Sequence, residues 1–232
     1  MLRRILLSLC VLVLLISSGC QQPRRFPAGR MSRARPAEPG SRAADKESPF
    51  PSGNFDYFLF TLSWSPEYCH GRPNNPQCGG AHPGFVVHGL WPQFNNGQWP
   101  SACSSEPGLS NPSGMLDIMP DPRLIQHEWT THGTCSGLTA QQYFGVIRKA
   151  YDSIQIPSLL VSPSRTPTRS ASEIKQMFTD ANPGMSSDDI AVSCHNRYLS
   201  AVEFCLGKDL QPTACQAVRD CTANSIRIST AQ

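Results

Sequence analysis

Five of the six histidines lie between His70 and His132, and three of the six fall in two short windows. The first window is HGLWPQ at residues 88–93, and the second is HEWTTHGTC at residues 127–135. Imidazole has an unperturbed pKa of about 6.5, so it can take up or release a proton near neutral pH. The windows therefore supply candidate groups for acid–base chemistry: His88, His127, Glu128 and His132.

A zinc site is the first chemistry to weigh, because His127 and Glu128 begin like the metalloprotease pattern H-E-x-x-H. In that pattern the histidines are four residues apart, whereas His132 follows His127 by five. At about 100° per helical residue the two rings would point roughly 140° apart, while Glu128 and His132 would converge. We therefore expect no metal here, and zinc-dependent hydrolysis stays an alternative.

Cleavage of RNA through its own 2′-hydroxyl suits the same groups better. The reaction needs a base for the hydroxyl proton, an acid for the leaving 5′-oxygen and donors for the charged phosphorus intermediate. A helix that carries Glu128 and His132, facing His88 at the end of a strand, would place two imidazoles on opposite sides of a phosphate.

Both windows resemble the active-site segments of the RNase T2 family. Other stretches match in the same order: FDYFLFTLSW and Cys69 before the first window, and NPGMSSDDIAVSC and LSAVEFCLGKDL after the second. The resemblance spans about Phe55 to Ile228. It implies an α+β fold with a central, mostly antiparallel sheet, flanked by helices and stapled by disulfides. It also implies an endoribonuclease that works without metal or cofactor.

The resemblance implies a role for each residue. His88 would be the general acid and His132 the general base of a transphosphorylation that yields a 2′,3′-cyclic phosphate, and hydrolysis of that ester would reverse the two roles. His127 would bind the scissile phosphate, and Glu128 would stabilise the transition state or hold the protonation pattern. We expect the other three histidines to be ordinary surface or core residues.

The sequence departs from the family pattern at Thr131, where a lysine is common. Such a charge can be worth about 10²- to 10³-fold in rate, so a catalytically weakened RNA-binding protein is the alternative function. Trp91, Gln93 and Trp99 stand at the spacings of the family's base-binding residues, and stacking on an aromatic ring accepts any base. Packing under the loop is the alternative role of Trp91. Leu124 stands where an aromatic of the second base site is usual, so selectivity there is in doubt.

Ten cysteines divide into Cys10, Cys20 and eight between residues 69 and 221. No C-x-x-C occurs among the eight, which favours disulfides over metal ligation. The resemblance implies the pairs Cys69–Cys78, Cys103–Cys135, Cys194–Cys221 and Cys205–Cys215.

The amino terminus is typical of an export signal. Arg3 and Arg4 precede an apolar run at residues 5–16 that is short for a membrane span of about 20 residues, so an uncleaved anchor is the weaker alternative. Ser-Ser-Gly-Cys at residues 17–20 resembles a bacterial lipobox, with Ser17 where Leu is usual, and ordinary signal-peptidase cleavage also fits. We expect a signal peptide at 1–19, a lipidated Cys20, and a periplasmic, outer-membrane-attached or secreted protein.

A Pro/Arg-rich tether at residues 20–48 separates this signal from a catalytic domain at 49–232. The tether has too few large apolar residues to order itself. It carries a net charge of +4 and Arg3 and Arg4 add +2, so a total of +3 leaves the domain at −3. Because RNA-coating proteins need a broad basic surface, we expect RNA contacts that are local. A monomer is the default expectation.

The domain must place the two windows together. Residues 55–64, 84–89 and 198–206 have the apolar patterns of strands. Residues 138–154 predict a helix with Thr139 as its N-cap, and a second helix is expected from about Ser172 to before Asn182. Strands with intervening helices give an α+β expectation.

Overall fold

A computed structural model describes residues 51–79, 84–161, 163 and 165–230. The expected signal peptide at 1–19, the tether at 20–48 with Cys20, and His82 lie outside the described residues, so these assignments stay predictions. Within the described part of the chain, no helix has the length and apolar character needed to cross a membrane.

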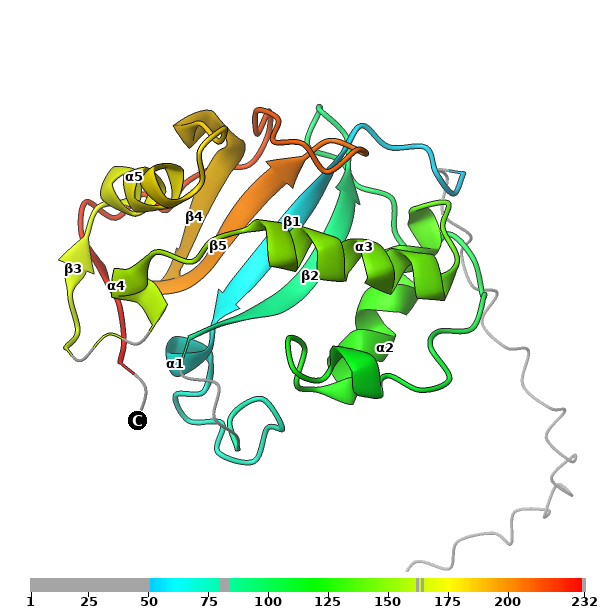
Figure 1. The fold of residues 1–232 in the computed structure, drawn as a ribbon, viewed down its shortest axis with the longest axis horizontal. Helices are drawn as coiled ribbons and strands as arrows, with labels where there is room; N and C mark the ends of the chain where they lie inside the picture. Colours follow the sequence, from blue (N-terminus) through cyan, green and yellow to red (C-terminus); the bar gives the residue numbers. More distant parts are fainter. Residues whose placement is uncertain (1–50, 80–83, 162, 164, 231–232) are drawn as a thin grey trace, which may run out of the picture. The chain divides into compact units, whose positions relative to one another are not determined.

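One antiparallel sheet organises the domain (Figure 1). Its four main strands pair in the spatial order β2, β1, β5, β4, and a short ribbon of β6 and β3 continues from β5. Every pairing is antiparallel except the single β5–β6 contact. The strands are β1 (Tyr57–Trp64), β2 (Phe85–Gln93), β3 (Thr168–Arg169), β4 (Ile190–His195), β5 (Tyr198–Leu206) and β6 (Ile226–Arg227).

Helices α3 and α5 lie across one face of this sheet in Figure 1. Both begin with a capping box: Thr139 caps α3 together with Gln142, and Ser170 caps α5 together with Glu173. The predicted α+β class is therefore confirmed. The helices are α1 (Ser65–Tyr68), α2 (Pro122–Thr131), α3 (Ala140–Ser153), α4 (Ser158–Val161) and α5 (Ala171–Ala181), with short 3₁₀ turns at Ser113–Met115, Gly133–Cys135 and Ser187–Asp189.

The two faces of β1 have different surroundings. Phe58, Phe60, Leu62 and Trp64 point one way and join the main core together with apolar residues of α3 and α5. Alternate residues point the other way, where Tyr57 and Leu59 form a small cluster with Cys205. Thr61 and Ser63 continue along this second face, which is the face that carries the functional site.

Strand β2 is longer than predicted. The sequence pattern suggested an end at Gly89, but residues 90–93 pair with residues 57–60 of β1. Proline normally argues against a strand interior because it lacks an N–H, yet β2 lies at the edge of the sheet, where Pro92 is tolerated.

All four predicted disulfides are present. Cys69–Cys78 closes the loop after α1, Cys103–Cys135 joins the segment after β2 to the end of α2, and two bridges hold the C-terminal segment, Cys194–Cys221 and Cys205–Cys215.

Candidate active site

His88 sits in a β-bulge in the middle of β2. Thr61 of β1 pairs with Gly89 and Leu62 pairs with Val87, so His88 has no partner across the ladder. A bulge bends the strand and redirects a side chain, and the His88 side chain is 41% exposed. The prediction that His88 ends a strand is wrong, because the apolar pattern does not reveal where a ladder shifts register.

Helix α2 supplies the other three groups. Asp121 caps its start by accepting from the Arg123 N–H at 2.9 Å, and Pro122 occupies the first helical position, where no N–H is needed. The helix ends at Thr131, and His132 follows as the C-cap with φ −117° and ψ −46°. His132 is therefore outside the regular helix.

The expected divergence of His127 and His132 is also wrong. Their ring centroids are 6.4 Å apart, and one ligand atom from each of His127, Glu128 and His132 can be chosen so that all three lie within 4.8 Å of one another. The 140° separation assumed a regular helix through residue 132, but α2 ends at Thr131 and the φ of His132 is −117° instead of about −63°. Helical geometry thus gives no argument against a metal.

Glu128 forms the buried floor of the site. The residue is 1% exposed, its Oε2 accepts from Trp91 Nε1 at 2.7 Å, and its Oε1 lies 3.8 Å from His88 Nε2. A Cβ at Gly89 would collide with Oε2, so only glycine leaves room for this carboxyl group. Burial raises the pKa of Glu128 to about 8, although the Trp91 hydrogen bond acts in the opposite direction. The carboxyl group is therefore mostly protonated at neutral pH.

Trp91 lies between the two principal imidazoles. Its ring is 5.1 Å from His88 in an edge-to-face arrangement and 5.3 Å from His132 in a tilted one. With its indole N–H on Glu128, Trp91 fixes the arrangement of three candidate catalytic groups. It packs within the site, and its stacking on a base stays a prediction.

Burial also sets the protonation of the imidazoles. It lowers the pKa of His132 to about 4, with smaller contributions from the nearby His127 and His88. The pKa of His88 is lowered as well, first by burial and then by His127. His132 Nδ1 is buried, and no hydrogen-bond partner for it is found among the described residues. His132 is therefore neutral, and able to accept a proton, over most of the pH range.

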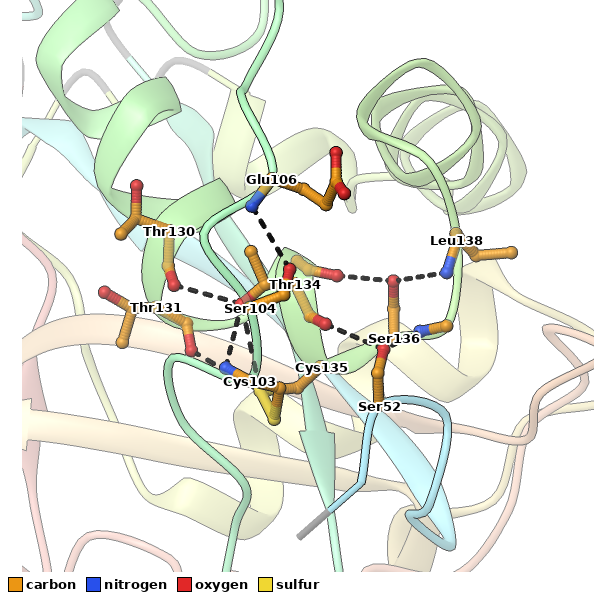
Figure 2. The surroundings of a disulfide bond; sticks show 12 residues. Ser52, Cys103, Ser104, Glu106, Thr130, Thr131, Thr134, Cys135, Ser136 and Leu138 are labelled. Atoms are coloured by element: carbon orange, nitrogen blue, oxygen red, sulfur yellow. Dashed lines mark hydrogen bonds between the residues drawn. A yellow bond between two sulfur atoms is a disulfide. The ribbon is translucent and has the colours of Figure 1, made fainter. Parts of the chain in front are cut away.

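The end of α2 is held by the segment that follows β2 (Figure 2). Beside the Cys103–Cys135 disulfide, Thr134 Oγ1 accepts from the Cys103 N–H at 3.1 Å and donates to the Thr130 carbonyl at 3.1 Å. The Ala102 N–H donates to the Thr131 carbonyl at 2.8 Å. These contacts bracket His132 in the sequence and so fix its position.

The other residues predicted to bind substrate differ in how far they are exposed to solvent. Thr131 Oγ1 is 3.4 Å from His127 Nδ1, so the residue that replaces the expected lysine contacts the proposed phosphate-binding histidine. Gln93 is buried at the end of β2, Leu124 is half-buried against the core, and Trp99 is 57% exposed. Their roles in base binding stay predictions.

Comparison with known proteins identifies the family. The family model described as the ribonuclease T2 family matches residues 55–221. The chain belongs to the ribonuclease T2 family. A ribonuclease of Aeromonas hydrophila is 43% identical over 96 residues, which cover 40% of this chain and 43% of that protein. A probable ribonuclease of Haemophilus influenzae is 35% identical over 127 residues, which cover 46% of each chain. The match thus spans less than half the length of either relative.

Solved structures share the T2 fold. Ribonuclease MC1 from bitter gourd seeds superposes with a TM-score of 0.61 at 25% identity, covering 74% of this chain and 99% of that one. RNase NT in complex with 5′-AMP gives a TM-score of 0.61 at 24% identity, covering 76% and 98%. The superposition covers nearly the whole of both solved chains and about three quarters of this one.

The sequence did not lead us to two features of the T2 site. The Trp91–Glu128 hydrogen bond joins residues from different windows, and no local pattern reports it. Gly89 gave a weak signal, since glycine inside a strand often marks a close approach of other groups. That approach is made by the Glu128 carboxyl group.

Proposed function

We propose that the protein is an endoribonuclease of low base specificity that cleaves RNA without a metal. The observation that carries the proposal is the arrangement of His88 and His132 on either side of Trp91, above the buried Glu128. The family supports the reaction class, and RNase NT bound to 5′-AMP is a structural neighbour that holds a nucleotide.

The first step opens the chain. His132 accepts the proton of the 2′-hydroxyl, the 2′-oxygen forms a bond to phosphorus, and the bond from phosphorus to the 5′-oxygen breaks. His88 in its protonated form delivers a proton to that 5′-oxygen. The products are a 2′,3′-cyclic phosphate and a strand with a free 5′-hydroxyl.

The second step returns both histidines to their starting state. His88, now neutral, takes a proton from water as the water oxygen attacks phosphorus, and His132 returns its proton to the departing 2′-oxygen. The protonated Glu128 can donate a hydrogen bond to the negative phosphoryl oxygen, as a neutral carboxylic acid does in other buried sites. His127, which is exposed beside these groups, supplies a further donor.

Cleavage of RNA in EDTA tests the mechanism. We expect wild-type protein and the control Lys149→Ala, an exposed side chain on α3, to cut RNA through a cyclic-phosphate intermediate. His88→Ala and His132→Ala should each lose at least about 10²-fold in rate. Activity that disappears in EDTA and returns with zinc would favour hydrolysis by the His127, Glu128 and His132 cluster instead.

RNA that is bound but left intact would support the alternative, a catalytically weakened binding protein. Thr131 is the observation that favours this alternative, because the lysine common in the family is missing. Equal cutting by either histidine variant would refute the proposed roles.

We also propose that the protein is exported as a monomer and attached to a membrane through lipidated Cys20. The residues at 1–20 and the eight paired cysteines of the domain support export, since disulfides persist in oxidising compartments. Mass spectrometry of the mature N-terminus tests the anchor, and an unmodified Cys20 would exclude it.

A further inference from the structure

Residues just before β1 bind the turn that follows His132. Ser52 Oγ donates to the Thr134 carbonyl at 2.8 Å and accepts from the Gly137 N–H at 3.1 Å. The two bonds join residues that are 82 and 85 positions apart in the sequence, and Figure 2 shows Ser52 beside this turn. The segment around Cys103 binds the hydroxyl of Thr134, so Ser52 adds a separate hold on the carbonyl of that residue.

Gly53 continues the contact toward His132. The Gly53 N–H donates to the Cys135 carbonyl at 2.8 Å, and the Cys135 N–H donates to the His132 carbonyl at 3.0 Å. Two hydrogen bonds therefore lead from Gly53 through Cys135 to the backbone of the candidate base.

A pair of glycines makes this close approach possible. Gly53 and Gly137 have positive φ angles of +82° and +78°, which favour glycine. A Cβ on Gly137 would lie 3.0 Å from Gly53 Cα and 3.4 Å from Gly53 N. These are backbone atoms, so they cannot turn aside as the end of a side chain can. Both the backbone angle and the available space at residue 137 therefore favour glycine.

The same segment is bound to the strand of His88. The Asp56 N–H donates to the Gln93 carbonyl at 2.8 Å, and Asp56 Oδ2 accepts from the Asn95 N–H at 2.8 Å. Gln93 is the last residue of β2. Residues 52–56, which we call the N-terminal clasp, thus join the strand of one candidate catalytic histidine to the turn that follows the other.

The clasp also has contacts that do not involve the catalytic segments. Lys208, which follows β5, donates from Nζ to the Gly53 carbonyl at 3.3 Å, and its Nζ lies 4.3 Å from the centre of the Phe55 ring. The Asn54 N–H donates to the Pro51 carbonyl at 3.1 Å and closes a turn. The clasp is therefore fixed to the rest of the domain and can act as a support for the turn after His132.

The backbone of His132 is held on both sides along the chain. Its N–H donates to the Glu128 carbonyl at 3.0 Å, which ties it to α2, and its carbonyl accepts from the Cys135 N–H. Because His132 is the C-cap of α2 and lies outside the regular helix, the second hold comes from the turn and not from the helix. That turn is the part of the chain that the clasp binds.

We propose that Ser52 and Gly53 are positioning residues, which hold His132 in place relative to the strand of His88. The family model matches from residue 55 onward, so it assigns a role to neither residue. The inference rests on the proposed function, in which His132 accepts the proton of the 2′-hydroxyl. A base must lie within hydrogen-bond reach of the proton that it accepts, and a displacement of about 1 Å can cost about 10²-fold in rate. The clasp therefore acts on catalysis through the position of the base.

The variant Ser52→Ala of the full chain tests the clasp, because it removes the hydroxyl that makes two of the bonds. A single neutral hydrogen bond shifts an equilibrium by about two- to tenfold, so we expect kcat to fall about three- to tenfold. The clasp has no proposed contact with RNA, so KM should stay within about twofold of wild type. Ser52→Thr keeps the hydroxyl and should keep most of the wild-type kcat. Ser158→Ala, at an exposed serine that begins α4, is the matched control and should leave both constants unchanged.

Two further measurements separate positioning from a general loss of structure. Gly137→Ala should lower kcat by about 10²-fold, because its Cβ displaces the Gly53 backbone from the turn. Amide hydrogen exchange followed by mass spectrometry needs no activity. In Ser52→Ala, exchange should become faster in peptides that cover residues 132–137 and stay as in wild type in those that cover α5.

A wild-type kcat in Ser52→Ala would overturn the positioning role. A higher KM with an unchanged kcat would overturn it as well, since that result indicates a contact with the substrate. An equal loss in Ser52→Thr would show that the bonds of the hydroxyl are not responsible. If the wild-type protein cuts no RNA, the proposed function fails, and exchange decides the clasp separately. Faster exchange at residues 132–137 in Ser52→Ala would then support the clasp, and unchanged exchange would exclude it.

Discussion

The substitution Glu128→Gln should increase the stability of the protein at high pH. Glu128 is buried, and its pKa of about 8 means that the folded state holds a proton that the unfolded chain releases at about 4.5. A carboxyl group with a raised folded-state pKa contributes stability that is complete below the unfolded pKa and is lost as the pH rises through the folded one. Glutamine has nearly the same shape, keeps an acceptor for Trp91 and does not titrate.

The size of the effect follows from the two pKa values. Each unit of pKa difference corresponds to about 1.4 kcal/mol, so the shift from 4.5 to about 8 represents on the order of 5 kcal/mol. About 1 kcal/mol of this is already lost at pH 5 and about 4 kcal/mol at pH 8. The free energy of unfolding of Glu128→Gln relative to wild type should therefore rise by about 3 kcal/mol between pH 5 and pH 8, a large part of a typical total of about 5–15 kcal/mol.

Urea denaturation with intact disulfides at the two pH values measures this difference. Glu173→Gln is the matched control, because hydrogen bonds from Ser170 lower the pKa of Glu173 at the start of α5. A lowered folded-state pKa means that the Glu173 carboxylate adds stability as the pH rises through that pKa. Glu173→Gln should therefore be less stable than wild type at high pH, which is the opposite of the result expected for Glu128→Gln. If Glu128→Gln gains nothing between pH 5 and pH 8, the carboxyl group is ionised in the folded protein and the argument for a neutral donor fails.

Two further predictions concern activity. The pH dependence of kcat/KM should be bell-shaped with an acid optimum. The base, His132, is neutral only above its pKa of about 4, and the acid, His88, is protonated only below a pKa that is itself lower than 6.5. An optimum above pH 7 would contradict the lowered pKa values. Gly89→Ala should force apart Glu128 and Trp91 and reduce kcat/KM by about 10²-fold, since misplacement by about 1 Å can cost that much. Circular dichroism should show a retained fold, and activity within twofold of wild type would show that the carboxyl group moves aside freely.

The sequence predicted the elements whose signals are local. Strand β5 has the predicted bounds, and β1 begins two residues later than predicted. Both strands could be predicted because the aromatic and apolar residues in these segments are typical of a buried sheet. Thr139 is the N-cap of α3 as predicted, and the helix spans Ala140–Ser153 within the predicted residues 138–154. Family resemblance supplied the disulfide pairs, which spacing alone leaves open, and all four are formed.

Features that depend on register or on distant packing could not be predicted. The bulge at His88 arises from how β2 aligns with β1, and a single sequence does not encode that alignment in any short pattern. Helix α2 ends at Thr131, whose carbonyl accepts from the Ala102 N–H, a contact with a segment about thirty residues away in the sequence. The bonds from Ser52 to the turn after His132 join residues that are 82 and 85 positions apart.

The shifted pKa values and the missing lysine point to the same working condition. Burial disfavours charge on His88, Glu128 and His132 alike, so these three groups carry little charge at neutral pH. A phosphate needs positive charge to be bound and stabilised, and Thr131 supplies none. Lowering the pH protonates His88 and so adds positive charge, and His132 stays neutral at any pH above about 4. Acid conditions therefore provide both the proton for the leaving oxygen and a positive charge beside the phosphate.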